Sequence, residues 1–136
     1  MLAGMSEALD ADPLELCQAA MERFNSGEVE AILEGFDPEV EWWPLRSETE
    51  GPYRGHDGVR RWVQETAELF DHSYATISEA RWEGDAILAE GRIDLQGKQS
   101  GAPIEIPVTW VFRVKGDKLA WGRAFTDRNA ALVELE

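Results

Sequence analysis

The sequence GRIDLQ places an arginine and a carboxylate, Arg92 and Asp94, one residue apart, with Glu90 two residues before the arginine. Side chains at positions i and i+2 of a strand share a face and lie about 7 Å apart along it. Arg92 cannot usefully lose its proton, so its role would be to hold an anion or to orient an acid. A carboxylate beside an arginine stays ionised and accepts hydrogen bonds, whereas one kept dry and unpaired becomes a donor. We therefore predict Arg92 and Asp94 as a catalytic pair, with Glu90 as a candidate second acid.

A second stretch, EVEWWPLR, sets two tryptophans side by side between a glutamate and a proline. Neighbouring side chains of a strand point to opposite faces, so Trp42 and Trp43 cannot both enter one core. We predict that Trp43 faces a cavity together with Glu41, which is another candidate donor acid. Trp42 is then expected to point outward.

The predicted cavity is lined mainly by aromatic residues, and each assignment has an alternative. Aromatic side chains are more often core filling, and Arg92 with Asp94 could form a plain salt bridge on an exposed face. Glu41 and Glu90 could face solvent or a subunit interface, and His56 could simply line a loop. The residues expected to bind the ligand are Trp43, Glu41, Trp62, Glu90, Trp110, Phe112, Trp121, Arg123, Phe125 and His56.

Composition limits the partners of this 136-residue chain. Its 27 acidic and 13 basic residues give a net charge of −14, which argues against a nucleic-acid backbone or an anionic membrane as a partner. No stretch approaches the roughly 18 apolar residues of a membrane span. The single cysteine, Cys17, lies in an apolar helical stripe, so we expect a core residue in a cytoplasmic protein. His56 and His72 show no ligand spacing, and we expect neither a metal nor a cofactor.

Hydrophobic periodicity and turn signals predict two helices, a strand, a third helix, four strands in a meander and a short last helix. Asp12 caps the first helix, Asp37 follows the second, and Asp57 caps a third. A run of strands separated by short turns comes next, and Asp127 caps a short last helix. The predicted strands span residues 39–43, 73–82, 86–96, 104–114 and 119–126.

We predict an α+β fold: a cone-shaped, strongly curved, mixed or antiparallel sheet with three N-terminal helices on its concave face and a short C-terminal helix. A curved sheet must bury one face, and the amphipathic helices are available to cover it. Residues 1–10 are expected to form a flexible N-terminal arm, and residues 11–136 a single domain. The alternative is another α+β sheet, such as a ferredoxin-like dimeric barrel. Helices clustered before a four-strand meander argue against it.

Four stretches resemble the SnoaL-like branch of the nuclear transport factor 2-like superfamily: FNSGEVEAILEGFDPEVEWWP, YRGHDGVRRW, SGAPIEIPVTWVFRVKGDKL and GRAFTDRNAALVEL. The resemblance covers about residues 10–135 and implies the cone-shaped fold. The family includes ketosteroid isomerases, limonene epoxide hydrolase, and polyketide cyclases and dehydratases, beside binding domains with no known reaction. Because a shared fold does not settle chemistry, each position has to be compared separately.

The resemblance finds none of the working groups of ketosteroid isomerase in this chain. The positions of its catalytic aspartate, its tyrosine and its protonated aspartate correspond to Trp43, Ala20 and Trp110. Indole has one donor and no basic atom, so it cannot abstract a carbon-bound proton. The isomerase mechanism is therefore not expected here.

The resemblance finds part of the catalytic set of the epoxide hydrolase in this chain. Arg92 and Asp94 match the arginine and aspartate of the hydrolase's middle strand. Arg123 stands where the hydrolase has its second aspartate, so Glu41 or Glu90 would have to serve as the base that activates water.

These features predict a domain that binds an apolar or aromatic small molecule, with or without an anionic group. It could catalyse an isomerase, cyclase, dehydratase or hydrolase reaction. The alternative is a non-catalytic dimeric binding or interaction module whose cone is plugged by aromatic side chains. Family members commonly pair through the outer sheet face, so the resemblance implies a homodimer that covers Trp42 there.

Overall fold

The computed structural model describes residues 12–45, 51–98 and 101–136, and the predicted arm at residues 1–10 lies outside these ranges. The helices and strands are α2 (Pro13–Ser26), α3 (Val29–Glu34), β1 (Phe36–Trp43), β2 (Tyr53–Arg54), α5 (Gly55–Leu69), β3 (Phe70–Glu83), β4 (Ala86–Gly97), β5 (Pro103–Lys115), β6 (Lys118–Phe125) and α6 (Arg128–Glu134). The described strands form one mixed sheet in the order β2-β1-β6-β5-β4-β3, in which only β1 and β6 run parallel.

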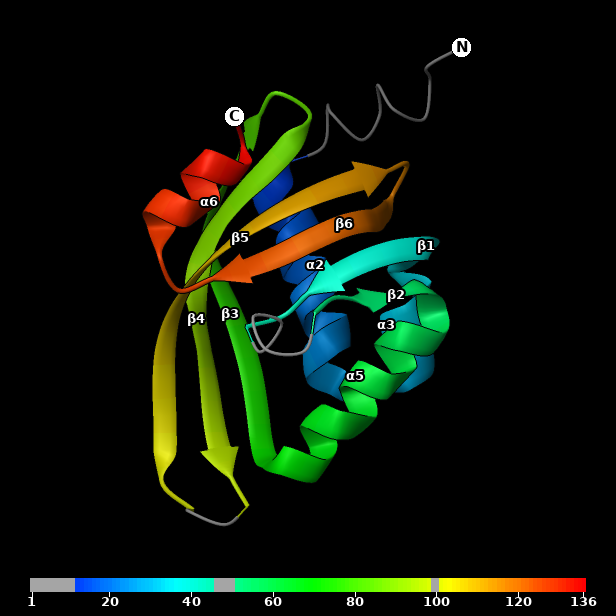
Figure 1. Cartoon of the computed structure of the whole chain (residues 1–136), viewed down its shortest axis with the longest axis vertical. Coiled ribbons are helices and arrows are strands. Elements are labelled where there is room, and N and C mark those ends of the chain that lie inside the picture. The colour runs from blue at the N-terminus through cyan, green and yellow to red at the C-terminus, as the bar shows by residue number, and fades with distance from the viewer. Residues whose placement is uncertain (1–11, 46–50, 99–100) are drawn as a thin grey trace.

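The sheet is strongly curved and has helices on both sides (Figure 1). Helices α2, α3 and α5 contribute to the core on the concave face, whereas α6 packs against a smaller apolar cluster on the outer face. The predicted fold class is confirmed in its curved mixed sheet, its N-terminal helices and its short C-terminal helix.

Two element boundaries differ from those expected. Phe36, predicted on the second helix, begins β1 and pairs with Leu119 of β6, because pairing with a neighbouring strand supplies backbone partners that an isolated short helix cannot. Helix α5 begins at Gly55, so Asp57 lies in its first turn and does not cap it. The two-residue strand at Tyr53–Arg54 was not predicted.

The caps expected at the first and last helices are confirmed. Asp12 Oδ1 accepts a hydrogen bond from the Leu14 N–H at 2.9 Å, and Asp127 Oδ1 accepts one from the Asn129 N–H at 2.9 Å. Each such cap contributes about 1 kcal/mol by satisfying a helix N–H that has no partner in the helix.

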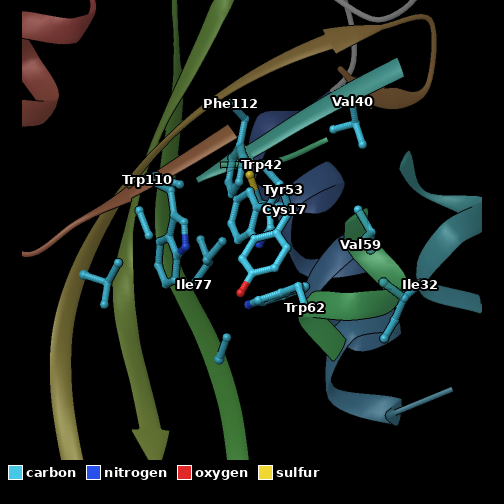
Figure 2. Close-up of a cluster of buried hydrophobic side chains, with 14 of the residues drawn as sticks. Cys17, Ile32, Val40, Trp42, Tyr53, Val59, Trp62, Ile77, Trp110 and Phe112 are labelled. Atoms are coloured by element: carbon cyan, nitrogen blue, oxygen red, sulfur yellow. The ribbon is translucent and has the colours of Figure 1, made fainter. Parts of the chain in front are cut away.

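Aromatic rings fill much of the concave side, as Figure 2 shows. Trp62 of α5 stacks on Phe24 of α2 with ring centroids 5.1 Å apart, and it meets Trp42 of β1 edge-on at 5.3 Å. Such pairs contribute about 0.5–1.5 kcal/mol each beyond the area they bury. Cys17 lies in the same core, as expected, and burial raises the pKa of its thiol to about 12.

The Trp42 ring lies directly over the backbone of Gly122 on the neighbouring strand. A Cβ atom at Gly122 would lie 2.9 Å from Cζ3 of Trp42 and 3.1 Å from Cδ1 of Phe112. Because Trp62 packs against the same indole, the ring has little room to retreat. Gly122 therefore sets how deeply Trp42 enters the core.

Replacing Gly122 with alanine is expected to lower the free energy of unfolding by about 1–3 kcal/mol, since the added methyl group overpacks the core. Urea denaturation measures this change. A suitable control is Gly84→Asn, at a turn glycine with a φ of 64° and no atom within 4 Å of the added Cβ. Asparagine tolerates that backbone conformation, so the free energy of unfolding should fall less in Gly84→Asn than in Gly122→Ala. Equal losses in the two variants would contradict the packing argument.

Candidate functional site

The two adjacent tryptophans lie on opposite faces of β1, but in the reverse of the predicted orientation. Trp42 is 6% exposed and packs in the concave core with Val40, whereas Trp43 and Glu41 bond to each other on the outer face. The predicted orientation was wrong because it would have placed the carboxylate of Glu41 among aromatic rings, where an ionised group is costly. Apolar Val40, two residues before Trp42, is the signal in the sequence that favours the observed orientation.

Arg92 and Asp94 share a face of β4, as predicted, but it is the outer face. The alternating residues Ala89 and Ile93 belong to the concave core or pack against it. The Arg92 Nε atom lies 3.3 Å from Asp94 Oδ2 and 3.7 Å from Glu105 Oε2, and 51% of the arginine side chain is exposed. Their predicted placement inside the cone is therefore wrong, and the geometry is that of an exposed salt bridge. Their catalytic role stays a prediction.

Three residues of β6 that were expected inside the cone, Trp121, Arg123 and Phe125, also lie on the outer face. Arg123 stands beside Trp43 in the register of β1 and β6, and its guanidinium stacks on the Trp43 ring. Residues that stand side by side on paired strands point to the same face of the sheet. Because β1 is reversed relative to the prediction, the side chains of β6 are reversed as well. The prediction that these residues share one face with Trp43 is confirmed, and the choice of face is wrong.

The other three aromatic predictions lie on the concave side. Trp62, Trp110 and Phe112 are 7%, 2% and 5% exposed, and the rings of Trp110 and Phe112 stack with centroids 6.4 Å apart. Their packing matches the alternative in which aromatic rings fill the cone.

The remaining polar predictions, Glu90 and His56, lie away from this core. Glu90 is on the outer face, where Oε1 accepts a hydrogen bond from Arg128 Nε of α6 at 2.7 Å, so its predicted place in the cone is wrong. His56 is in the first turn of α5 with Nε2 2.9 Å from the Phe36 carbonyl oxygen. It lines a separate hollow of about 220 Å³ together with Lys118.

On the outer face, the carboxylate of Glu41 accepts hydrogen bonds from Trp43, Trp121 and Arg54. We call these four residues the Glu41 cluster. Glu41 Oε2 accepts from the indole Nε1 atoms of Trp43 at 2.7 Å and Trp121 at 3.2 Å. Its Oε1 accepts from Arg54 Nε at 3.3 Å. The hydrogen bond from Trp43, followed by those from Trp121 and Arg54, lowers the pKa of Glu41 against the opposing effect of burial.

The concave side holds polar groups that the sequence did not reveal. Trp42 Nε1 is buried and has no hydrogen-bond partner among the described residues. The Tyr53 hydroxyl, in the strand paired with Trp42, donates to Glu65 at 3.1 Å, and Glu65 Oε1 lies 3.5 Å from Arg61 Nε. Figure 2 shows Tyr53 and Trp62 beside Trp42 in the same part of the core. These groups come together only because β2 pairs with β1, and that strand was not predicted.

The polar groups on the concave side are better suited to donate hydrogen bonds than to accept a proton. Indole N–H groups can only donate, and the carboxylate of Glu65 already binds Tyr53 and Arg61. In residues 12–45, 51–98 and 101–136, no three His, Cys, Asp or Glu side chains form a group that could hold a metal ion. No helix in these same ranges has the length and apolar character needed to cross a membrane.

A family model described as a SnoaL-like domain matches residues 17–121, which is more than half of the chain. The chain belongs to the SnoaL-like domain family. Among proteins with curated functions, none matches this SnoaL-like sequence significantly.

Solved structures support the same conclusion at the level of the fold. An NTF2-like protein of unknown function from Burkholderia pseudomallei is 17% identical, with 89% of this chain and 94% of that one covered and a TM-score of 0.73. A protein with a ketosteroid isomerase-like fold from Catenulispora acidiphila, in complex with trimethylamine, is 16% identical over 82% and 84% of the two chains, with a TM-score of 0.74. IdmH from Streptomyces antibioticus, a proposed polyketide cyclase, is 20% identical over 92% and 99%, with a TM-score of 0.71.

This SnoaL-like domain therefore separates two kinds of chemistry on one sheet. The concave face carries rings and neutral donors, whereas the outer face carries the Glu41 cluster and most of the predicted polar residues. The resemblance on which the fold was predicted is confirmed, and the faces of the predicted site are corrected.

The lowered pKa of Glu41 predicts a pH-dependent contribution to stability. A carboxyl group whose folded pKa lies below its unfolded value stabilises the fold above the unfolded pKa, about 4.3, and the contribution is lost as the pH falls through the folded pKa. Glu41→Gln should lower the free energy of unfolding by about 1 kcal/mol at neutral pH, allowing for solvent screening. The difference from the native protein should shrink in acid, as measured by urea denaturation across the pH range.

Glu105→Gln serves as the matched control, because Glu105 is 66% exposed and lies 3.7 Å from its arginine partner. It should change stability less at every pH. A Glu41→Gln effect that is the same at neutral and acidic pH would show that the charge of Glu41 does not cause it.

Proposed function

We propose that this SnoaL-like domain binds an apolar or aromatic small molecule on the concave side of its sheet, with a hydrogen-bond acceptor of the ligand meeting Trp42. The observation that carries the proposal is the buried Nε1 atom of Trp42, which has no partner among the described residues. A buried donor left unpaired costs about 1–3 kcal/mol. An acceptor that reached this atom would recover part of that cost.

An aliphatic strip on the concave face offers the ligand an apolar surface. Ile93 and Ile106 pair across β4 and β5 and pack against the core, and the next pair along the same face is Leu95 with Ile104. Ile104 is 48% exposed, so the strip passes from the buried rings to the surface. Covering such a surface would contribute about 25 cal/mol per Å² of apolar area.

Access to Trp42 requires movement of neighbouring side chains, because its Nε1 atom is buried in the structure. Trp62, which packs edge-on against Trp42, comes from α5 and is 7% exposed. A ligand that enters from the aliphatic strip would have to displace the Trp62 ring or a similar aromatic side chain to reach Trp42. The proposal is therefore for binding with side-chain rearrangement.

Binding without acid–base catalysis is the form of this function that the geometry supports best. Arg92 and Asp94 lie on the outer face, and Glu65 is held by Tyr53 and Arg61. A neutral indole donor can orient a carbonyl or ether oxygen but cannot accept a proton. This matches the alternative of a non-catalytic binding module more closely than an isomerase or hydrolase.

A matched ligand pair tests the proposal. Acetylnaphthalene and ethylnaphthalene of the same ring isomer have similar size, but only the ketone carries an acceptor. The native protein should bind the ketone about two- to tenfold more tightly in calorimetric titration, since one net hydrogen bond contributes about 0.5–1.5 kcal/mol. Trp42→Phe should abolish this preference.

The neighbouring tryptophan provides the control variant. Trp43 lies on the outer face with its Nε1 bonded to Glu41, so Trp43→Phe should keep the preference for the ketone. Because the readout is the ratio of two affinities measured on one folded variant, a general loss of stability does not mimic the result. Failure of both ligands to bind, or a ketone preference that survives in Trp42→Phe, would refute the proposal.

We also propose that two copies of the chain pair through the outer sheet face. Trp43 and Trp121 are only half-buried there, and Tyr74, which stands opposite Asp94, is 46% exposed. The face carries acids and arginines together, so two copies related by a twofold axis could set opposite charges against each other. Trp42 was expected to be covered by this pairing, but it lies in the core, and Trp43 takes that place.

Sedimentation velocity tests the pairing. The expected mass is twice the 15.3 kDa of one chain, and it should fall toward one chain mass in Tyr74→Lys, which adds a positive charge to the proposed interface. Tyr74→Phe keeps the ring and should keep the dimer. A single-chain mass for the native protein at every concentration would contradict the proposal.

A further inference from the structure

We infer that a hollow at the end of β6, at the edge of the concave core, binds a small monocarboxylate through Arg123. The hollow has a volume of about 150 Å³, and its lining includes Leu45, Arg123, Phe125, Thr126 and Asp127. It brings a cation together with polar groups and with the apolar side chains of Leu45 and Phe125. The inference concerns Arg123 on the outer face and does not rest on the proposed site at Trp42.

Arg123 forms no ion pair with a carboxylate of residues 12–45, 51–98 or 101–136, although the chain is strongly acidic. No acidic oxygen within the described ranges lies within 4.0 Å of its guanidinium, and Arg23 is the other described arginine without an ion pair. Arg23 lies in the last turn of α2, where the helix dipole favours a cation. Arg123 lies in a strand and has no helix dipole beside it, so within the described ranges its charge is left for an anion to meet.

Two aromatic rings hold the Arg123 guanidinium in a defined place. Its central carbon lies 4.9 Å from the ring centroid of Trp43 and 5.0 Å from that of Phe125. Contacts with ring faces leave the N–H groups at the edge of the planar guanidinium free to donate. A carboxylate matches two of these N–H groups at once, which a neutral ligand cannot do as well.

The rest of the lining defines the class of ligand. A volume of about 150 Å³ is enough for a benzene ring, Leu45 and Phe125 supply apolar contacts, and Thr126 adds a second polar side chain. Asp127 contributes a negative charge, although its Oδ1 already accepts the N–H of Asn129. That charge, and the net charge of −14, disfavour ligands with several negative charges. A single carboxylate on a small apolar body, such as benzoate, fits these conditions.

Titration with benzoate tests the site by calorimetry and by shifts of the indole N–H signals in nuclear magnetic resonance spectra. Arg123→Gln should weaken benzoate binding by about tenfold or more, since it removes a charge-assisted pair. Arg123→Lys keeps the charge but cannot donate two parallel N–H groups to one carboxylate. Its affinity for benzoate should therefore lie between those of the native protein and Arg123→Gln. The neutral analogue benzyl alcohol should bind the native protein more weakly than benzoate does.

Arg113→Gln is the matched control. Arg113 lies on the same face and stacks on Trp121 at 5.6 Å, but it also pairs with Asp85 at 3.4 Å. This variant should bind benzoate as the native protein does, and so should Trp42→Phe, whose altered side chain is on the concave face. The second comparison separates failure of this inference from failure of the concave site.

Several results would overturn the inference. Benzoate binding that is undetectable, or equal in the native protein and Arg123→Gln, would do so, as would equal affinities for benzoate and benzyl alcohol. If benzoate does not bind and Arg123→Gln lowers the mass in sedimentation, the carboxylate that Arg123 meets belongs to a second copy of the chain. Thermal denaturation of each variant confirms that it is folded during these measurements.

Discussion

The exclusion of a carboxylate from the concave core determines how strand β1 is oriented. Burying the apolar surface of Val40 and Trp42 is favourable even though the Trp42 N–H is left unpaired, whereas burying the ionised Glu41 without a partner would cost several kcal/mol. On the outer face the same carboxylate accepts hydrogen bonds from Trp43, Trp121 and an arginine. The strand therefore has one favourable orientation, and it sends one tryptophan of the adjacent pair to each side.

That orientation extends through the sheet by strand pairing. Trp42 stands beside Gly122 of β6, Gly122 stands opposite Phe112 of β5, and Phe112 stands opposite Ile87 of β4. Residues that stand opposite each other share a face, so each pairing passes the choice of face to the next strand. By this sequence of pairs, Arg92 comes to lie on the outer face with the other charged residues.

The two faces consequently suit different kinds of recognition. On the concave face a charge would be costly, so specificity has to come from shape and from neutral donors such as the Trp42 indole. On the outer face, water is close and charges are tolerated, and stacking on Trp43 and Phe125 gives Arg123 a fixed position without an acid partner. The two binding sites that we propose therefore differ in chemistry, with an apolar molecule on the concave side and an anion at Arg123.

The sequence by itself determined the order of the helices and of every described strand except β2, the caps at Asp12 and Asp127, and the sets of residues that share a strand face. These depend on local patterns of period 3.6 or 2 and on short-range hydrogen bonds. Only the tertiary structure decided which face the helices cover, that Tyr53 lies beside Trp42, and that the Arg123 guanidinium stacks on the rings of Trp43 and Phe125. The period of a strand is the same whichever face is buried, so the choice depends on contacts between residues far apart in the chain.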